Sequence, residues 1–317
     1  MIVGHQKQLE FLRIARESGK LGHAYILSGP SRIGKKTAAL EWLSGIFGVR
    51  LNQAGAHPDF MFVEPLVDPK TEKRAAEITV AQIRSLIWKL SLKPSVAPIK
   101  VALVNDAHLM NTESQNCLLK TLEEPPGESL IILVAQNSKR LLETIRSRCQ
   151  TLQFNFVAAK EMRDYATGPA KLEAGQAAEI VRLSFGRPGR MIEFAADPDR
   201  LKEWQARSRE FARVVASGLP ERFAYAAKVA EADNFDEELE AWQAHYRGLL
   251  LEGLNGKAEE VAPDAPKPQF VFTKLKTADN PSQKFAAILE KIHALGMVLQ
   301  TTNANPRLAI ENFMLDL

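Results

Sequence analysis

The sequence predicts an α/β fold with a parallel five-stranded sheet in its first half, followed by a region that is helical throughout. Three observations indicate this. Up to about residue 155, apolar runs of strand length alternate with segments of helical spacing, which is typical of a parallel sheet covered by helices on both faces. A glycine-containing loop with a lysine joins the first such run to a helix. Beyond residue 155 the strand signal fades and helical spacing continues.

The first half supplies the elements of the α/β region. Strands are predicted over residues 24–27, 61–63, 101–104, 130–134 and 151–154. A helix over residues 7–18 precedes the first strand, and further helices end near Gly48, before Pro94 and before Pro125 and Pro126. Two capping boxes, Thr79 with Gln82 and Thr112 with Gln115, are predicted to begin the last two of these helices.

The second half divides into a short helical region and a longer one. Helices are predicted over residues 158–167, 173–185, 190–197, Leu201–Ser217 and Phe235–Leu251, with a closing helix pair over 284–317. Residues 255–283 collect four prolines among polar residues and are predicted to form a long surface loop. The expected domains are residues 1–155, an α/β domain, 156–199, a small helical domain, and 200–317, an all-helical domain.

Length and composition favour a multidomain globular protein. A chain of 317 residues is longer than the usual length of a domain with one hydrophobic core. Its net charge of +3 does not by itself indicate a nucleic-acid binder. No window has the length of a membrane span, and the N-terminus lacks a signal-peptide core, so a cytoplasmic protein is expected. Cys117 and Cys149 lie far apart, which suggests neither a zinc site nor a disulfide framework.

The loop after the first strand has the pattern of a phosphate-binding loop. Gly29 and Gly34 allow its backbone N–H groups to point at a phosphate, and Lys35 adds a full positive charge. The hydroxyl that should follow the lysine and hold Mg²⁺ is replaced by Lys36, and Thr37 comes one residue late. Because one helical residue is about 100° of rotation, Thr37 is not expected to substitute. The alternative is a strand-to-helix turn that binds nothing.

A second candidate position follows the third strand, where phosphate-loop ATPases place an Asp for Mg²⁺ and a Glu that activates water. Here these positions are Asn105 and Asp106. An amide is a weaker Mg²⁺ ligand than a carboxylate, and Asp reaches less far than Glu, so both changes weaken hydrolysis. An ordinary Asn-Asp turn is the alternative. His108 is expected to be a turn or packing residue, because no second His or Cys lies at metal-ligand spacing.

A third candidate lies in residues 144–150, just before the fifth strand. An arginine at a domain edge can reach the nucleotide site of another subunit and stabilise charge on the transferred phosphate. Arg146 and Arg148 are the two arginines of this segment. The alternative, an arginine that is merely on the surface, is the commoner case for an isolated arginine.

These segments carry a resemblance to a known family. Residues 112–126, which end in Leu-Glu-Glu-Pro-Pro, and the triplet Ser147, Arg148 and Cys149 resemble the AAA+ subunits of bacterial clamp loaders. The resemblance implies an AAA+ module with a helical lid and a C-terminal collar domain. It further implies that Arg148 is an arginine finger acting in trans and that Asn137 occupies the sensor position.

Within the family, Lys36 and Asn105 make the chain similar to the delta-prime class, whose ATPase motifs are degenerate, and residues 303–312 resemble the end of the collar domains of that class. The resemblance implies delta and gamma or tau subunits as partners in a hetero-pentamer, together with the sliding clamp and primed DNA. It implies ATP or ADP at most at a degenerate site, with Mg²⁺ only on the neighbouring subunit. An ATP-hydrolysing gamma-type subunit and a pure scaffold are the alternatives.

The chain departs from the family pattern in two places. Many members bind zinc through four cysteines, but residues 44–60 contain none, only His57 and Asp59, so no zinc is expected. In the predicted lid, Gly186–Gly189 ends in glycine where ATPase relatives place a sensor arginine, and Arg190 is next to it. Nucleotide sensing by the chain's own lid is therefore not expected.

Overall fold

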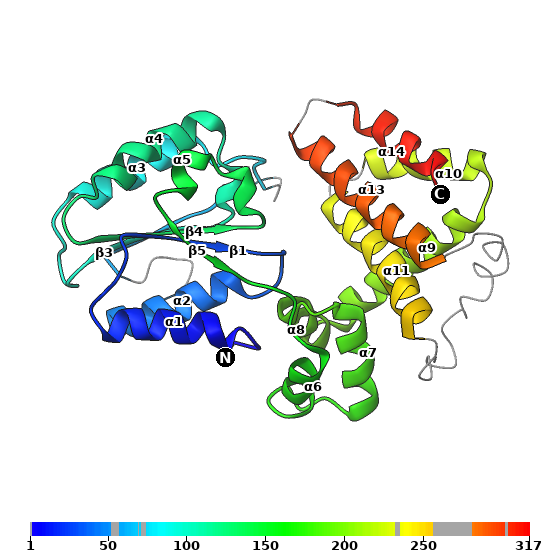
Figure 1. Cartoon of the computed structure of the whole chain (residues 1–317), viewed down its shortest axis with the longest axis horizontal. Helices are drawn as coiled ribbons and strands as arrows, with labels where there is room; N and C mark the ends of the chain where they lie inside the picture. Colours follow the sequence, from blue (N-terminus) through cyan, green and yellow to red (C-terminus); the bar gives the residue numbers. More distant parts are fainter. Residues whose placement is uncertain are drawn as a thin grey trace. The chain divides into compact units, whose positions relative to one another are not determined.

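The computed structural model describes residues 2–51, 57–68, 70, 74–231, 235–255, 281–301 and 304–317. The chain forms two compact units, Met1–Ala195 and Ala196–Leu317. The first unit contains both the sheet and the three short helices α6, α7 and α8 that follow it (Figure 1). No helix among the described residues is long and apolar enough to cross a membrane.

The first unit is built on a five-stranded sheet in which every pairing of neighbouring strands is parallel, in the order β2-β3-β4-β1-β5. This confirms the predicted fold class. The strands are β1 (Ala24–Ser28), β2 (Phe60–Val63), β3 (Lys100–Val104), β4 (Ser129–Ala135) and β5 (Gln150–Gln153). Because β1 and β4 lie in the interior of the sheet, the loops after them meet near its middle, and β5 forms one edge.

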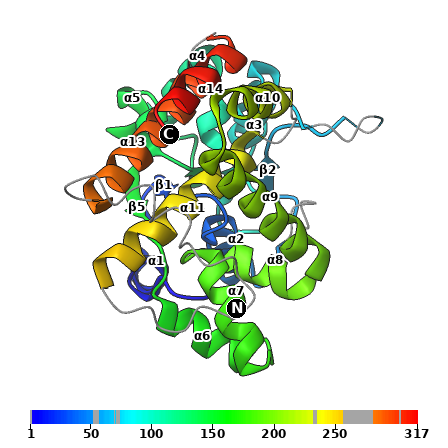
Figure 2. The same cartoon turned by 90° about the vertical axis from the view of Figure 1, so that its right-hand side faces the viewer.

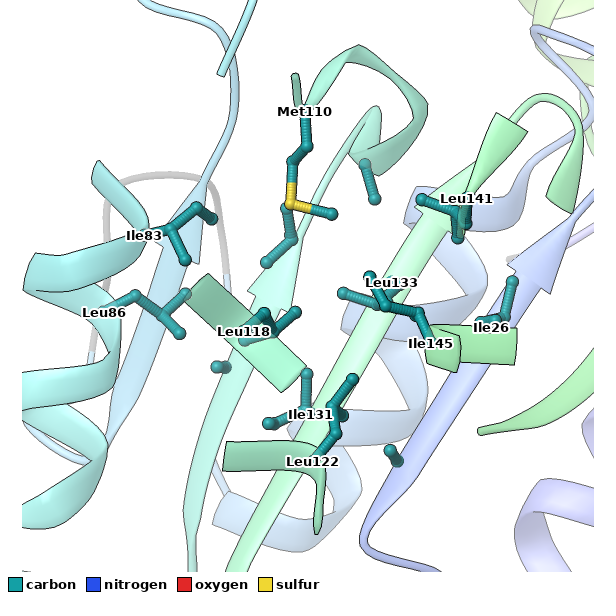
Figure 3. Packing of buried hydrophobic residues seen from close by; sticks show 14 of the residues in the cluster. Ile26, Ile83, Leu86, Met110, Leu118, Leu122, Ile131, Leu133, Leu141 and Ile145 are labelled. Atoms are coloured by element: carbon teal, nitrogen blue, oxygen red, sulfur yellow. The ribbon is translucent and has the colours of Figure 1, made fainter. Parts of the chain in front are cut away.

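Successive side chains of a strand point to opposite faces of the sheet. Alternate residues of the strands therefore belong to two separate hydrophobic cores, one on each face. Tyr25 and Leu27 belong to the core shared with α1 (Gln6–Glu17) and α2 (Lys35–Phe47). Ile26, on the opposite face, belongs to the core of the other face (Figure 3).

The helices over that opposite face are α3 (Val80–Ser91), α4 (Thr112–Glu123) and the short α5 (Glu143–Arg146). Their buried residues include Ile83 and Leu86 from α3, Leu118 from α4 and Ile145 from α5, which all point at the sheet in Figure 3. Helices therefore cover both faces, as the alternation of strands and helices predicts.

One predicted capping box is confirmed and the other is wrong. Thr79 and Gln82 cap each other at the start of α3. At the start of α4 the capping residue is Asn111, whose side chain accepts a hydrogen bond from the N–H of Ser114. Gln115 is buried instead, and its amide donates to the carbonyl of Met110 and accepts from the N–H of Leu142. The local pattern assigned the Gln115 side chain to the helix cap, but this side chain is used in tertiary packing instead.

Two short 3₁₀ helices, η1 (Ala107–Leu109) and η2 (Ser138–Arg140), follow β3 and β4, and the lid helices are α6 (Ala159–Thr167), α7 (Ala174–Ser184) and α8 (Pro188–Ala196). The prediction that the last of these begins at residue 190 is wrong by two residues. Pro188 is tolerated there because the first residue of a helix needs no intrahelical N–H bond.

The described part of the second unit contains α9 (Pro198–Ala216), α10 (Leu219–Ala230), α11 (Phe235–Asn255), α13 (Pro281–Thr301) and α14 (Pro306–Leu315). Helix α11 packs along α13, and α10 packs against α14 (Figure 2). The Trp242 ring stacks on Phe211 at a centroid distance of 5.2 Å and on Phe313 at 5.4 Å. This aromatic stack joins α9, α11 and α14 into one core.

The predicted surface loop over 255–283 is tested only at its ends. Residues 256–280 lie outside the described part of the chain. Asn255 still belongs to α11, and residues 281–283 belong to α13, so the loop prediction is wrong at both ends. Pro281 is the first residue of α13, a position that proline favours, and does not belong to a loop.

Candidate functional site

The phosphate loop connects β1 to α2, and its backbone adopts conformations that its two glycines permit. Gly29 has φ +154°, and a Cβ there would lie 2.2 Å from the carbonyl oxygen of Phe154, next to β5. Gly34 has φ +101°, and a Cβ there would have no heavy atom within 4 Å. The two glycines therefore act differently. Gly29 allows the close approach of a neighbouring backbone, whereas Gly34 bends the loop toward open space.

Lys35, the loop lysine, folds back onto its own loop. The residue is 7% exposed, and its Nζ donates hydrogen bonds to the carbonyl oxygens of Gly29 and Pro30, both at 2.6 Å. Burial lowers the pKa of Lys35 to about 8, although the nearby Asp106 opposes this shift. A phosphate entering the loop would offer oxygens that replace these two carbonyls and would favour the charged amine.

Lys36 takes the place of the metal-binding hydroxyl. Its Nζ lies 3.7 Å from Oε2 of Glu64, the residue after β2, and 5.9 Å from the ring centroid of Phe62. Thr37 is exposed. Glu64 is thus part of the site although no motif in the sequence indicated it; the available signal was that it directly follows a predicted strand.

Asn105 and Asp106 lie at the end of β3 and contact this cluster. Nδ2 of Asn105 donates to Oε2 of Glu64 at 3.2 Å and to Oδ2 of Asp106 at 3.1 Å. Asp106 has a left-handed backbone, with φ +54°. Its Oδ2 also accepts a hydrogen bond from Nη2 of Arg74 at 2.5 Å. Asp106 is therefore paired with a cation of its own chain. Sequence reasoning missed Arg74, since it lies in the segment between β2 and α3, which carries no motif.

His108 and Asn137 lie near the same end of the sheet but are used locally. Burial lowers the pKa of His108 to about 4, and its Nδ1 accepts from the N–H of Gln136 at 3.4 Å. The neutral, buried ring suits a packing residue. Oδ1 of Asn137 accepts from the N–H of Lys139 at 2.9 Å and so caps η2. The next N–H, of Ser138, donates to Oγ of Ser28 at 3.0 Å, which joins this loop to the residue before Gly29.

The lid contacts the phosphate loop through its backbone. The N–H of Gly189 donates to the carbonyl of Arg32 at 2.8 Å, and a Cβ on Gly189 would come within 2.6 Å of that oxygen. Nε of Arg32 also lies 3.5 Å from Oε2 of Glu193. Glycine at the position of the sensor arginine therefore allows the N-terminus of α8 to lie directly on the loop.

The lid also brings a cation to the site, and it is a different arginine from the one sequence reasoning considered. Burial lowers the pKa of Arg187 to about 10, with Arg32 adding to the shift, and Arg187 in turn lowers the pKa of Lys35. Arg190 is 1% exposed and fully buried. Arg187 is thus a lid residue whose positive charge acts on Lys35 of the phosphate loop.

Arg148 lies apart from these groups, between α5 and the edge strand β5. Its side chain is 35% exposed, and Nη2 pairs with Oε1 of Glu123 at 2.7 Å. Nη1 donates to the carbonyl of Thr144 at 2.9 Å. Arg148 is thus held against the end of α4 and against Thr144 of α5, next to the edge strand β5.

The described residues contain no group of three or more His, Cys, Asp or Glu that could hold a metal ion. Both cysteines are free and partly buried, and burial raises the pKa of the Cys149 thiol to about 12. Of the zinc-module region, residues 52–56 lie outside the described part of the chain.

A phosphate loop after the first strand of a parallel β2-β3-β4-β1-β5 sheet, followed by a small helical lid, defines a phosphate-loop module of the AAA+ class. Residues 4–158 match the family described as DNA polymerase III, delta subunit. Over this region the chain is similar to the clamp-loader subunits of bacterial DNA polymerase III, and its relatives support a subunit of the delta-prime type.

Curated relatives agree with this assignment. The chain is 32% identical to DNA polymerase III subunit delta' of Pseudomonas aeruginosa over 52% of its length, and this alignment spans 53% of the relative. It is 29% identical to subunit delta' of Escherichia coli over 84% of its length and 76% of the relative. Subunit tau/gamma of Haemophilus influenzae is 32% identical over 50% of this chain and 24% of the relative.

Among solved structures, a gamma subunit-related protein of Thermotoga maritima aligns with 96% of this chain and 97% of its own, at 18% identity and a TM-score of 0.44. The RuvB branch migration motor of the same organism aligns with 96% of this chain and 87% of its own, at 16% identity and a TM-score of 0.47.

Proposed function

We propose that this chain is the delta-prime subunit of a DNA polymerase III clamp loader. It would complete a hetero-pentameric ring with delta and gamma or tau subunits, which opens the sliding clamp and places it on primed DNA in the cytoplasm. The similarity to delta-prime and tau/gamma subunits supports membership in such a complex. The chain's own part would be to offer Arg148 to the nucleotide site of a neighbouring subunit.

The position of Arg148 is the observation that carries this proposal. The residue precedes β5, which is the edge strand of the sheet, and β5 has three exposed residues out of four. An edge with unpaired backbone groups and exposed side chains is a surface on which another subunit can dock. The pairing of Arg148 with the half-exposed Glu123 is weak enough to exchange for a phosphate.

The chain's own nucleotide site would not hydrolyse ATP. Lys36 and Asn105 replace two oxygen ligands, and Asp106 is paired with Arg74 and so cannot freely orient a water molecule. Nucleotide would be an optional ligand here, Mg²⁺ would belong to the neighbouring ATPase subunit, and no zinc would be needed.

ATP turnover by the isolated chain separates this proposal from the gamma-type alternative. We expect hydrolysis to be negligible, because the metal ligands and the catalytic carboxylate are altered together. Turnover at about 1 s⁻¹, within the common range for active enzymes, would favour the gamma-type motor. Lys35→Ala should change clamp loading little, since no hydrolysis at this site is needed.

A further inference from the structure

The AAA+ class implies Mg²⁺ with its nucleotide, and the donor groups of this site can be tested against that ion. Mg²⁺ needs nearly octahedral oxygen ligands at about 2.0–2.1 Å and retains several waters. The two positions that normally supply a hydroxyl and a carboxylate are Lys36 and Asn105. An ammonium cannot be a ligand, and the atom that Asn105 presents to Glu64 and Asp106 is Nδ2, an N–H donor that does not coordinate a cation. The residues therefore do not fit the ion.

The two carboxylates that remain are each paired with a cation of this chain. Glu64 lies 3.7 Å from Nζ of Lys36, and Asp106 lies 2.5 Å from Nη2 of Arg74. Three of the four side chains are partly buried: Lys36 and Glu64 are 32% and 31% exposed and Asp106 is 21% exposed, whereas Arg74 is 46% exposed. Lys36 and Arg74 are therefore positioned at the carboxylates that would face a metal.

The net charge of the site also disfavours a divalent cation. Glu64 and Asp106 are offset by Lys36 and Arg74, so Lys35 leaves these five side chains with one net positive charge. Arg187 of the lid adds a further positive charge near Lys35. A divalent cation would enter next to three cations, which is unfavourable at short range in a partly desolvated site. An anion would be attracted, and Gly34 leaves open space at the mouth of the loop.

We infer that Lys36 and Arg74 replace the divalent cation in this site, so that the phosphate loop takes the triphosphate of a nucleotide as a metal-free anion held by Lys35. The substitution of a tethered cation for a metal removes the Lewis acid that hydrolysis needs but keeps the positive charge that binding needs. The inference concerns the isolated chain and does not depend on the ring role of Arg148.

Equilibrium binding of ATP to the full-length chain tests the inference, with one series in excess Mg²⁺ and one in EDTA. We expect ATP to bind in EDTA at least as tightly as in Mg²⁺. Lys35→Ala should weaken this binding by at least about tenfold, because a hydrogen bond to a charged phosphate is lost. Lys20→Thr, which removes an exposed lysine outside the site, is the matched control and should have no effect.

The double variant Lys36→Thr with Asn105→Asp restores the missing oxygen ligands. Its ATP affinity should become Mg²⁺-dependent by about tenfold, a usual size for coupling between two ligands. Electron paramagnetic resonance of added Mn²⁺ with ATP should show bound metal in the double variant but not in the parent chain.

Three results would overturn the inference: ATP binding by the parent chain that requires Mg²⁺, Mn²⁺ bound at its site, or no ATP binding in either buffer. Assembly of the chain with delta and gamma-type subunits is a separate readout. A failure of the binding test with normal assembly would leave the proposed ring function intact.

Discussion

At the scale of single residues, Asp59 shows how a buried charge organises a loop. Its carboxylate accepts hydrogen bonds from the N–H groups of Ser95, Val96 and Ala97 at 2.7, 2.8 and 2.9 Å, and it lies 3.5 Å from Nζ of Lys100. Burial opposes its ionisation, but these donors and Lys100 lower its pKa to about 2. Asp59, which lies in the segment that lacks the zinc-binding cysteines of the family, is thus a structural carboxylate.

Asp59→Asn should destabilise the first unit by about 3–5 kcal/mol, because it leaves the buried Lys100 without its counter-charge. Urea denaturation at neutral pH measures this change. Glu113→Gln is the control, since Glu113 and Arg84 are about 70% exposed and such a pair contributes about 1 kcal/mol or less. Equal effects of the two variants would contradict the assigned role of Asp59.

His245 of α11 makes the stability of the second unit depend on pH in the acid range. Its Nε2 is buried and has no hydrogen-bond partner among the described residues, and burial lowers its pKa from 6.5 to about 4. Between these values the unfolded chain binds a proton that the folded chain does not, so stability falls as the pH is lowered from about 6.5 to about 4. The free energy of unfolding should fall by about 3 kcal/mol over this range.

His245→Phe should remove this part of the pH dependence while keeping a ring beside Phe211, whose centroid lies 5.6 Å away. Denaturation of parent and variant at pH 7 and pH 4.5 provides the comparison. If both lose the same stability over that range, His245 is not the titrating group.

The residues of the site were predictable in unequal degree. The phosphate loop and the end of β3 follow from motifs of adjacent residues, so Lys36 and Asn105 could be read from the sequence. Arg74 and Glu64 could not, because their partners Asp106 and Lys36 are 32 and 28 positions away and only the fold brings them together. Ion pairs over such separations leave no local pattern in a single sequence.

At the scale of secondary-structure elements, the contact between α8 and the phosphate loop depends on one missing side chain. Gly189→Ala would place a Cβ at 2.6 Å from the carbonyl of Arg32, so α8 must move away or the loop must distort. We expect a destabilisation of about 1–3 kcal/mol, the usual cost of overpacking. Hydrogen exchange at the Gly189 amide should also become faster.

A matched control lies in the neighbouring helix. A Cβ added to Gly175 of α7 would have no heavy atom within 4 Å, so Gly175→Ala should stabilise the chain by about 0.5–1 kcal/mol. Thermal unfolding of the two variants should therefore shift in opposite directions. A stabilising Gly189→Ala would mean that α8 does not rest on the loop.

The first four strands could be predicted because each is a short apolar run and buried parallel strands are apolar on both faces. The edge strand β5 is more polar and mostly exposed, and its prediction depended on Leu152 and Phe154 within a short segment. The ends of elements were harder. The cap at Asn111 and the start of α13 at Pro281 depend on which of several suitable residues tertiary packing selects. The order of the strands in the sheet also has no local signal.

At the scale of the whole molecule, the family assignment and the proposed role rest on different kinds of evidence. The fold and the relatives support a clamp-loader subunit of delta-prime type. The proposed action in a ring rests on Arg148, which pairs with Glu123 and donates to the carbonyl of Thr144. In a ring, its guanidinium would exchange Glu123 for a phosphate of a neighbour.

The most direct test is clamp loading by a reconstituted complex that carries Arg148→Ala. An arginine finger acts on the charge that develops in the transition state, so assembly and nucleotide binding should survive, while the ATPase stimulated by clamp and DNA falls. Such fingers are worth on the order of 10³-fold at their own site. Because one of several sites is affected, total ATPase should fall by only a fraction and clamp loading by more.

Two further complexes sharpen this measurement. Arg148→Lys should not rescue loading, because a point charge on a flexible stem cannot reproduce the planar guanidinium. Arg163→Ala, which removes an exposed arginine from α6, should load normally. We expect a correctly sized Arg148→Ala ring with strongly reduced clamp loading; a correctly sized ring that loads clamps at the parent rate would contradict the finger role and leave only a scaffold.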